Sequence, residues 1–363
     1  MNDALPAIAS LEDDALPLAL VEAASGFMHE ARAANTRAAY GTAWRLFKAW
    51  CADNGRTALP ASPETVVGWI TALALGADGR KPRSRGTIAV YLTGVITAQR
   101  TAGYEFNTKH AALVEAWRGI SRNKARTATE RKAKPLLGRD LQRLLEGLDP
   151  SNVLDARDGA LLALGWSGAL RRSELVGLDW ESVGEGTGCL RIEEREEQRG
   201  AERVTVRGLV ITLARTKASQ ENAVSIVVPG DDMPTCMEWV EHWIATSQVQ
   251  PRQPIFRSIA RVKGGRHRIV AERLGGKSVS SALKKRVREL AIHSGKSKAE
   301  ADALVKRFTA HALRAGFITS AANNDLSLHD IAKHSRHRTL DVVAGYIRQA
   351  DGWKKSALKS IGF

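Results

Sequence analysis

The sequence predicts a mainly α-helical protein of two domains, with one small antiparallel β-sheet in the second domain. Its 363 residues are enough for two hydrophobic cores, at about 100–200 residues per domain. Apolar residues recur at spacings of three and four along most of the chain, which is the period of an amphipathic helix. Short segments rich in β-branched residues are confined to 189–228, and they predict the sheet.

The first third of the chain divides into an acidic tail and a helical domain. Residues 1–31 carry six Asp or Glu and no Lys or Arg, so we expect a tail there. A helical domain is predicted over 32–121, because Asn35 and Thr36 are good N-caps and an aromatic stripe follows them. Its four helices are expected over about 36–53, 63–75, 87–101 and 108–120, with a basic loop over 79–86.

A basic linker is predicted over 122–135. Six Lys or Arg and no large apolar residue stand between 122 and 134, and Pro135 follows them. The linker is either a solvated connector or a segment in contact with phosphates, where each cationic side chain releases a condensed counterion. The concentration of charge favours phosphate contact.

The second domain is predicted over 136–363. Its strands are expected at 189–193, 204–206, 210–214 and 224–228, and the densely charged stretch 194–203 is expected to be an exposed turn. Helices are predicted at 138–148, 155–170, 234–247, 279–293, 299–310 and 313–322, with two short ones around His329 and Val343 and a tail helix over 352–363.

The net charge points to a polyanionic partner. The chain carries 54 Lys or Arg against 39 Asp or Glu, a net charge of +15, and both predicted domains are basic. Such a charge is typical of proteins that bind nucleic acid or an anionic membrane surface. The longest apolar stretch, 159–170, is too short to cross a bilayer, and no secretory signal begins the chain. We therefore expect a cytoplasmic protein, associated with the nucleoid, that has no membrane partner.

Common phosphate-binding and metal-binding motifs are not found. Ala271 and Leu290 stand where two possible phosphate loops need glycine, and no group of Cys, His or acidic residues has metal-ligand spacing. An enzyme that acts on phosphodiesters without a metal has to supply positive charge from Arg, Lys and His. We therefore expect no metal and no cofactor.

A set of such residues occurs in a recognisable order. Arg171-Arg-Ser-Glu174-Leu follows the predicted buried helix, Lys217 lies in a predicted turn, and His311-Ala-Leu-Arg314 begins a later helix. His334-Ser-Arg-His337 and then Gly345-Tyr346 complete the set. In this order and spacing the sequence resembles the tyrosine recombinase (phage integrase) family, and in architecture it is most similar to the two-domain Cre-type members. The resemblance extends from about residue 32 onward and is strongest over 165–350.

The resemblance implies a role for each of these residues. Tyr346 would be the nucleophile that attacks a DNA phosphorus, and Arg171 and Arg314 would hold the phosphate oxygens with their forked donors. His311 would be the general base or a phosphate ligand, and Lys217 the general acid for the leaving 5′-oxygen. Glu174 would orient Arg171 or His311.

The second active-site histidine is less clearly placed. The family has it nine residues before the tyrosine, which selects His337 over His334. The glycine that usually precedes it is Arg336 in this chain. His334 therefore stays open as the alternative.

The resemblance also implies the partners and the shape. Residues 32–121 would be a core-binding (SAM-like) DNA-binding domain and 136–363 the catalytic domain, together a C-shaped clamp on double-stranded DNA. The enzyme would act as a homotetramer on paired sites through a Holliday junction. Trp353, Ala357 and Ile361 in the tail would then dock on a neighbouring subunit, or else pack on their own domain. The side chains expected to contact DNA are Arg80, Lys81, Arg83, Arg85, Arg122, Lys124, Arg126, Arg257, Arg261, Lys263, Arg266, Lys284, Lys285 and Arg288.

Two other functions share part of this pattern. A type IB topoisomerase or a telomere resolvase would use the same Arg, Lys, His and Tyr set. A DNA-binding regulator that has lost catalysis is the third possibility, and the departure at Arg336 keeps it open.

Overall fold

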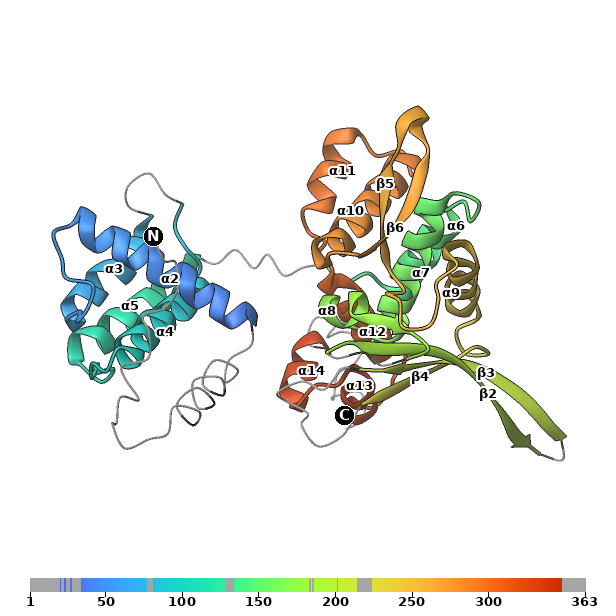
Figure 1. Ribbon diagram of the computed structural model, residues 1–363, viewed down its shortest axis with the longest axis horizontal. Helices are drawn as coiled ribbons and strands as arrows, with labels where there is room; N and C mark the ends of the chain where they lie inside the picture. Colours follow the sequence, from blue (N-terminus) through green and yellow to red (C-terminus); the bar gives the residue numbers. More distant parts are fainter. Residues whose placement is uncertain are drawn as a thin grey trace, which may run out of the picture. The chain divides into compact units, whose positions relative to one another are not determined.

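The computed structural model of the chain forms two compact units, Met1–Glu130 and Arg131–Phe363. It describes residues 34–76, 81–127, 134–182, 184, 186–200, 202–213 and 224–347, together with the single residues 20, 23 and 27. The expected tail helix over 352–363 lies outside the described residues, as does almost all of the acidic tail. Each unit is described by itself below (Figure 1).

The first unit contains the four helices that the sequence predicts. Ser62 caps the second of them by accepting a hydrogen bond from the Thr65 amide, Pro63 stands in its first turn, and Gly76 ends it in the left-handed conformation. The core is aromatic: the Phe47 and Trp69 rings lie 5.0 Å apart, edge to face. The helices are α2 (Ala34–Asp53), α3 (Pro63–Leu75), α4 (Arg85–Thr101) and α5 (Ala111–Thr127).

Helix α5 extends into the predicted linker, past the expected helix end at about 120. Two contacts fix its last turns: Arg85 Nε donates to Ser121 Oγ at 3.1 Å, and Lys124 Nζ donates to the Ala74 carbonyl at 2.7 Å. Lys and Arg are also good helix formers, which a reading of this segment by charge alone overlooks.

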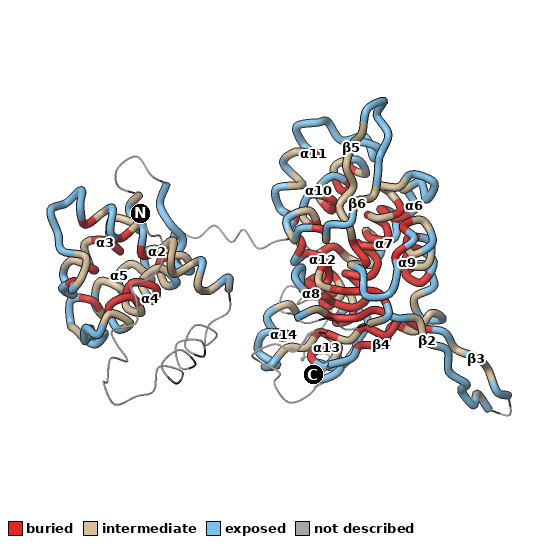
Figure 2. Tube along the Cα trace, viewed as in Figure 1, coloured by how far each residue is buried: buried red, intermediate tan, exposed pale blue. Residues whose placement is uncertain are grey.

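The second unit is built around a helix that is buried on all sides. Helix α7 (Val153–Ser167) has Asn152 as its N-cap, and every residue from Asp158 to Ser167 is buried (Figure 2). Such an apolar helix belongs in the centre of a domain. Around it lie α6 (Gly138–Glu146), α8 (Arg172–Val176), α9 (Pro234–Ser247), α10 (Gly276–His293), α11 (Lys298–Val305), α12 (His311–Asn323), α13 (Leu328–Ser335) and α14 (Leu340–Ile347).

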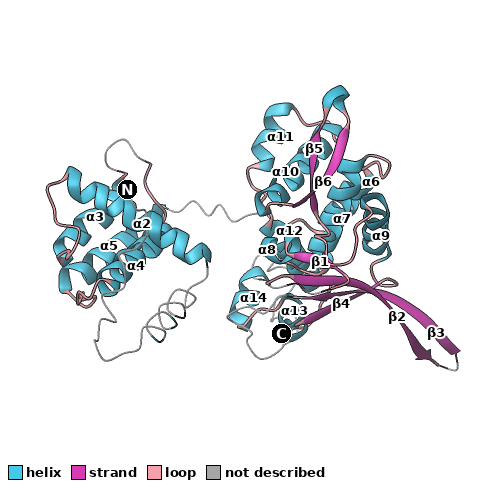
Figure 3. Cartoon of the chain, in the orientation of Figure 1, coloured by secondary structure: helices cyan, strands magenta, loops and turns pink. Residues whose placement is uncertain are grey.

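A four-stranded sheet completes this core (Figure 3). Its strands lie in the order β1 (Leu178–Trp180), β2 (Gly188–Arg199), β3 (Glu202–Thr212) and β4 (Ser225–Pro229). The last three are antiparallel as predicted, although β3 joins the two strands expected at 204–206 and 210–214. β1 is parallel to β2, so the sheet is mixed. β1 was not predicted, because three residues are too few to show a period.

The charged stretch 194–203 is not a turn but mostly strand. β2 and β3 pair from Cys189↔Thr212 out to Arg199↔Glu202, as a long hairpin with the reversal only at its end. Opposite charges face each other across the strands, with Arg207 Nε 2.9 Å from Glu194 Oε1. Most of these side chains are exposed, so the segment lacks the apolar alternation by which strands are predicted.

A second sheet, β5 (Arg257–Arg261) with β6 (His267–Arg273), lies outside 189–228, the segment to which the predicted strands are confined. A turn with Gly264 and Gly265 at positive φ connects its two strands. Among the described residues no helix is both long and apolar enough to span a bilayer.

Candidate active site

Arg314 lies at the centre of the candidate site, on the first turn of α12. It is 1 % exposed, and its Nη1 donates to the Ala169 carbonyl at 2.8 Å. Burial, followed by the charges of Arg171 and Arg336, lowers the pKa of this guanidinium to about 10. A cation that is desolvated and surrounded by other cations is stabilised when an anion binds beside it.

Arg171 and Glu174 form a second charged group at the start of α8. The Glu174 carboxylate accepts the Arg171 amide at 2.8 Å and Arg171 Nη1 at 2.5 Å. Burial alone would raise the pKa of Glu174, but Arg336 and Arg171 hold it below its usual range. The Arg171 side chain is 50 % exposed, so its guanidinium is accessible to a ligand. Glu174 holds its backbone amide and Nη1 at the same time.

His311 and Tyr346 are hydrogen-bonded to each other. His311 Nε2 lies 2.6 Å from Tyr346 Oη, although the residues come from α12 and α14. Burial, then the charges of Arg314 and Arg171, lower the pKa of His311, whereas burial raises the pKa of Tyr346 against the opposing effect of Arg314. At neutral pH the phenol is therefore the donor and the neutral imidazole the acceptor.

His337 completes the group. Its ring centroid lies 6.1 Å from that of Tyr346, and Nη2 of Arg314 lies 3.3 Å from its Nε2. Burial, followed by Arg314, Arg171 and its other cationic neighbours, lowers the pKa of His337 to about 4. This histidine is therefore neutral in the free protein.

His334, the alternative, is part of the packing instead. Its Nε2 donates to the Ser167 carbonyl at 2.7 Å, and its ring stacks on Phe317 at 4.4 Å. The geometry favours His337 over His334 as the histidine beside Tyr346.

The structure thus gathers Arg171, Glu174, His311, Arg314, His337 and Tyr346 in one place. Lys217 and Arg80 lie outside the described residues. The residues that sequence reasoning did not assign to the site are Arg336, which donates to Glu174 at 2.9 Å, and Ser335, whose Oγ lies 2.7 Å from His337 Nδ1. Arg336 was visible in the sequence only as a departure from the usual glycine.

Many of the side chains expected to contact DNA are on the surface. Those exposed on the first unit are Lys81, Arg83, Arg85, Arg122 and Arg126, and those on the second are Arg261, Lys263, Arg266 and Lys285. Arg261, Lys263 and Arg266 belong to the β5–β6 hairpin or its turn, so they project from one small element.

Like Arg85, which donates to Ser121 Oγ, three others have partners inside the protein. Lys124 donates to the Ala74 carbonyl, Arg257 Nη2 donates to the Ser247 carbonyl, and Arg288 Nε donates to Asp302 at 2.6 Å. Lys284 is half-buried. For Lys124, Arg257 and Arg288 the structure shows a contact within the fold, which competes with any contact to DNA.

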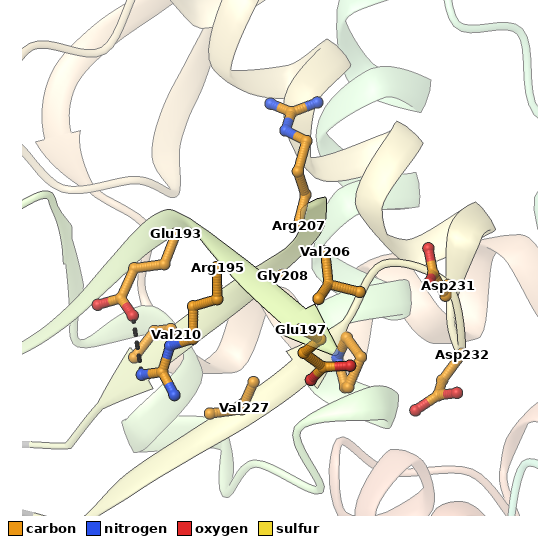
Figure 4. Close-up of a pocket in the computed structure, with 11 residues that line it drawn as sticks. Glu193, Arg195, Glu197, Val206, Arg207, Gly208, Val210, Val227, Asp231 and Asp232 are labelled. Atoms are coloured by element: carbon orange, nitrogen blue, oxygen red, sulfur yellow. Dashed lines mark hydrogen bonds and ion pairs between the residues drawn. The ribbon is translucent and has the colours of Figure 1, made fainter. Parts of the chain in front are cut away.

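A separate hollow lies on the four-stranded sheet (Figure 4). β2, β3, β4 and the turn after β4 line it with charged side chains, and Arg195 Nη2 donates to Glu193 Oε2 at 3.2 Å. None of the residues gathered around Tyr346 lines it. It is therefore not the site described above.

Comparison with known proteins places the chain in a family. Residues 134–352 match the phage integrase family. The chain belongs to that family. It is also 31 % identical over 336 residues to an integrase/recombinase, a xerD homologue from Selenomonas ruminantium, which covers 91 % of this chain and 86 % of the relative. This phage integrase family member is a tyrosine recombinase, an enzyme that cleaves and rejoins DNA at specific sites.

Solved structures with similar chains include two recombinases bound to DNA. One is XerH site-specific recombinase bound to a palindromic difH substrate, with 14 % identity, a TM-score of 0.47, and coverage of 83 % of this chain and 71 % of that one. The other is the Tn1549 transposon integrase with circular intermediate DNA, with 12 % identity, a TM-score of 0.49, and coverage of 85 % and 87 %.

Proposed function

We propose that this tyrosine recombinase cleaves DNA by attack of Tyr346 Oη on a backbone phosphorus. The new bond is a 3′-phosphotyrosyl ester, and the bond that breaks releases a 5′-hydroxyl. The observation that carries the proposal is the 2.6 Å hydrogen bond between His311 Nε2 and Tyr346 Oη. His311 is placed to take the phenol proton as the bond to phosphorus forms.

Two guanidiniums hold the phosphate. Arg171 stands immediately before α8 and Arg314 lies in α12, and each can direct two N–H donors at the non-bridging oxygens. Arg314 supplies charge from a buried position, where electrostatic interactions are strong, and Arg171 from the surface. His337 is a further donor to the phosphate, and Glu174 orients Arg171.

The leaving 5′-oxygen needs a proton, which Lys217 supplies in this proposal on the strength of the family resemblance. Because one phosphate ester replaces another, a 5′-hydroxyl from a second strand can attack the phosphotyrosine and restore Tyr346. The energy of the ester is conserved, so the cycle consumes no ATP, and the charge around phosphorus comes from Arg, Lys and His rather than from a metal.

Around this chemistry we propose the assembly that the resemblance implies. Residues 32–121 bind duplex DNA, and 136–363 form the catalytic domain, so that the two units grip the duplex as a clamp. Four copies act on paired sites and exchange strands through a Holliday junction, in the cytoplasm where the nucleoid is. The net charge of +15 and the exposed basic side chains of both units support this proposal.

A covalent adduct tests the chemistry directly. Duplexes that the protein selects from a random-sequence pool are nicked at successive positions, incubated with it in EDTA, and run on a denaturing gel. We expect a protein–DNA adduct with one strand, lost in Tyr346→Phe and in Arg314→Ala, while both variants still bind the duplex. Binding without an adduct at any nick position would overturn the proposal, as would an adduct that persists in Tyr346→Phe.

A further inference from the structure

Arg336 occupies a buried position whose backbone conformation suits glycine better than arginine. It ends α13 with φ 56° and ψ 48°, in the left-handed conformation that glycine adopts freely and other residues rarely. Its side chain is only 9 % exposed, so its charge is desolvated as well. A glycine would avoid both costs. The contacts of the guanidinium therefore have to compensate for them.

Those contacts connect two turns. Nη1 donates to the carbonyls of Gly168 and His334 at 3.0 and 2.9 Å, and Nη2 donates to the Ala169 carbonyl at 2.9 Å. Gly168 and Ala169 form the turn that leads from α7 into Arg171. His334 lies in the last turn of α13, three residues before His337. The Arg336 side chain thus connects the turn before Arg171 to the last turn of α13, which leads to His337.

The fourth contact involves Glu174. Nη2 of Arg336 donates to Glu174 Oε2 at 2.9 Å, while Glu174 also accepts from the amide and the side chain of Arg171. The buried carboxylate therefore lies between an inner guanidinium and an outer one. Because Arg336 already neutralises the charge of Glu174, the Arg171 guanidinium can still bind another anion.

We propose that Arg336 is a positioning residue for strand cleavage. It fixes Glu174 and the two turns, so that the Arg171 guanidinium is presented to the scissile phosphate. The inference rests on the proposed function, in which Arg171 binds that phosphate. Arg336 itself does not touch the reacting atoms.

The test compares the rate of adduct formation with DNA affinity on the nicked duplex. In Arg336→Gly, which suits the backbone, we expect the rate to fall about 10- to 100-fold, because a displaced ligand group costs that much, while Kd changes less than about twofold. Arg336→Lys should recover part of the rate, since an ammonium can pair with Glu174 but cannot make all four bonds. Arg252→Gly is the matched control, an exposed arginine at φ 67° outside the site, and should cleave like the wild type.

A double-mutant cycle separates positioning from a general effect on the fold. Arg336→Gly and Glu174→Gln act through one contact, so their effects on the rate should be clearly less than additive. Additive effects, a wild-type rate in Arg336→Gly, no recovery in Arg336→Lys, or a loss of rate matched by a loss of affinity would each overturn the positioning role. Absence of an adduct from the wild-type protein would instead overturn the proposed function.

Discussion

At the scale of single residues, hydrogen bonds determine which nitrogen of His337 carries the proton. The Ser335 hydroxyl donates to the Ile331 carbonyl at 2.5 Å, so it has no hydrogen left for Nδ1 of His337. Nδ1 is therefore the protonated nitrogen, and Nε2 accepts from Arg314. For Nε2 to donate to a phosphate, this imidazole has to take up a second proton.

We predict that bound DNA allows His337 to take up this second proton. A phosphate anion stabilises the imidazolium, so the pKa of His337, which is about 4 in the free protein, should rise in the complex. Imidazole NMR titration of the non-cleaving Tyr346→Phe protein, with and without the selected duplex, measures the change. His334, bonded to the Ser167 carbonyl, is the internal control. An unchanged pKa of His337 would contradict its role as a phosphate donor.

The pH dependence of cleavage follows from His311. Only its neutral form can accept the Tyr346 proton, and its pKa lies below the usual value of about 6.5. The rate at subsaturating nicked duplex, which reports the free enzyme, should therefore rise with pH up to that lowered pKa and stay level from about 6.5 to 8. A rate that continues to rise above pH 7 would show that the phenol loses its proton to solvent and not to His311.

At the scale of elements, one glycine sets the position of the helix that carries His311 and Arg314. A Cβ on Gly316 of α12 would lie 1.8 Å from the Leu136 carbonyl oxygen. The backbone of Leu136 makes two hydrogen bonds. Its amide donates to the Ala312 carbonyl, and its carbonyl accepts from Trp166 Nε1. Helix α12 is thus held against α7 through residue 136.

Replacing this glycine should displace the site. We predict that Gly316→Ala lowers the free energy of unfolding by about 1–3 kcal/mol, because the backbone has to move to admit the methyl group. It should also slow adduct formation, since His311 and Arg314 move with α12. Urea unfolding and the nicked-duplex assay measure the two effects. Gly119→Ala, on an exposed helical surface with open space at the Cβ, should instead raise the free energy of unfolding by about 1 kcal/mol, because alanine is the better helix former, and should leave adduct formation unchanged.

Most helices were predictable because each buries one apolar stripe or carries a recognisable cap. Helix α9 lies at the predicted residues, with Pro234 in its first turn. The predictions failed where the pattern comes from tertiary structure. The outer part of the β2–β3 hairpin is charged on both faces, β1 is three residues long, and the last turns of α5 are fixed by contacts to Ala74 and Ser121.

The members of the candidate site were predictable from motif order, but their connections were not. His311 and Tyr346 are 35 residues apart in the sequence, and only the packing of α12 with α14 shows that they are bonded. The choice between His334 and His337 needed the Ser167 carbonyl and Phe317, which no spacing rule includes. Arg336 looked like a defect in the pattern because its partner Glu174 is 162 residues away.

At the scale of the whole molecule, the net charge of +15 should govern DNA binding, but not every cation contributes equally. Arg286 is 4 % exposed and paired with Asp158 and Asp155, so its charge stabilises the fold. The turn of the β5–β6 hairpin is different, because Lys263 and Arg266 are exposed there. Net charge by itself does not distinguish these two uses.

The salt dependence of DNA affinity does distinguish them. Each phosphate contact contributes about 0.9 to the slope of log K against log salt, so Lys263→Gln with Arg266→Gln should reduce the slope by about 2. Arg139→Gln with Arg143→Gln removes the same charge from exposed positions on α6 and should leave the slope nearly unchanged. Fluorescence anisotropy with the selected duplex between 50 and 300 mM salt, about the range over which such affinities change measurably, provides both slopes. If the two variants lose slope equally, net charge alone draws the protein to DNA, and the hairpin turn makes no phosphate contact of its own.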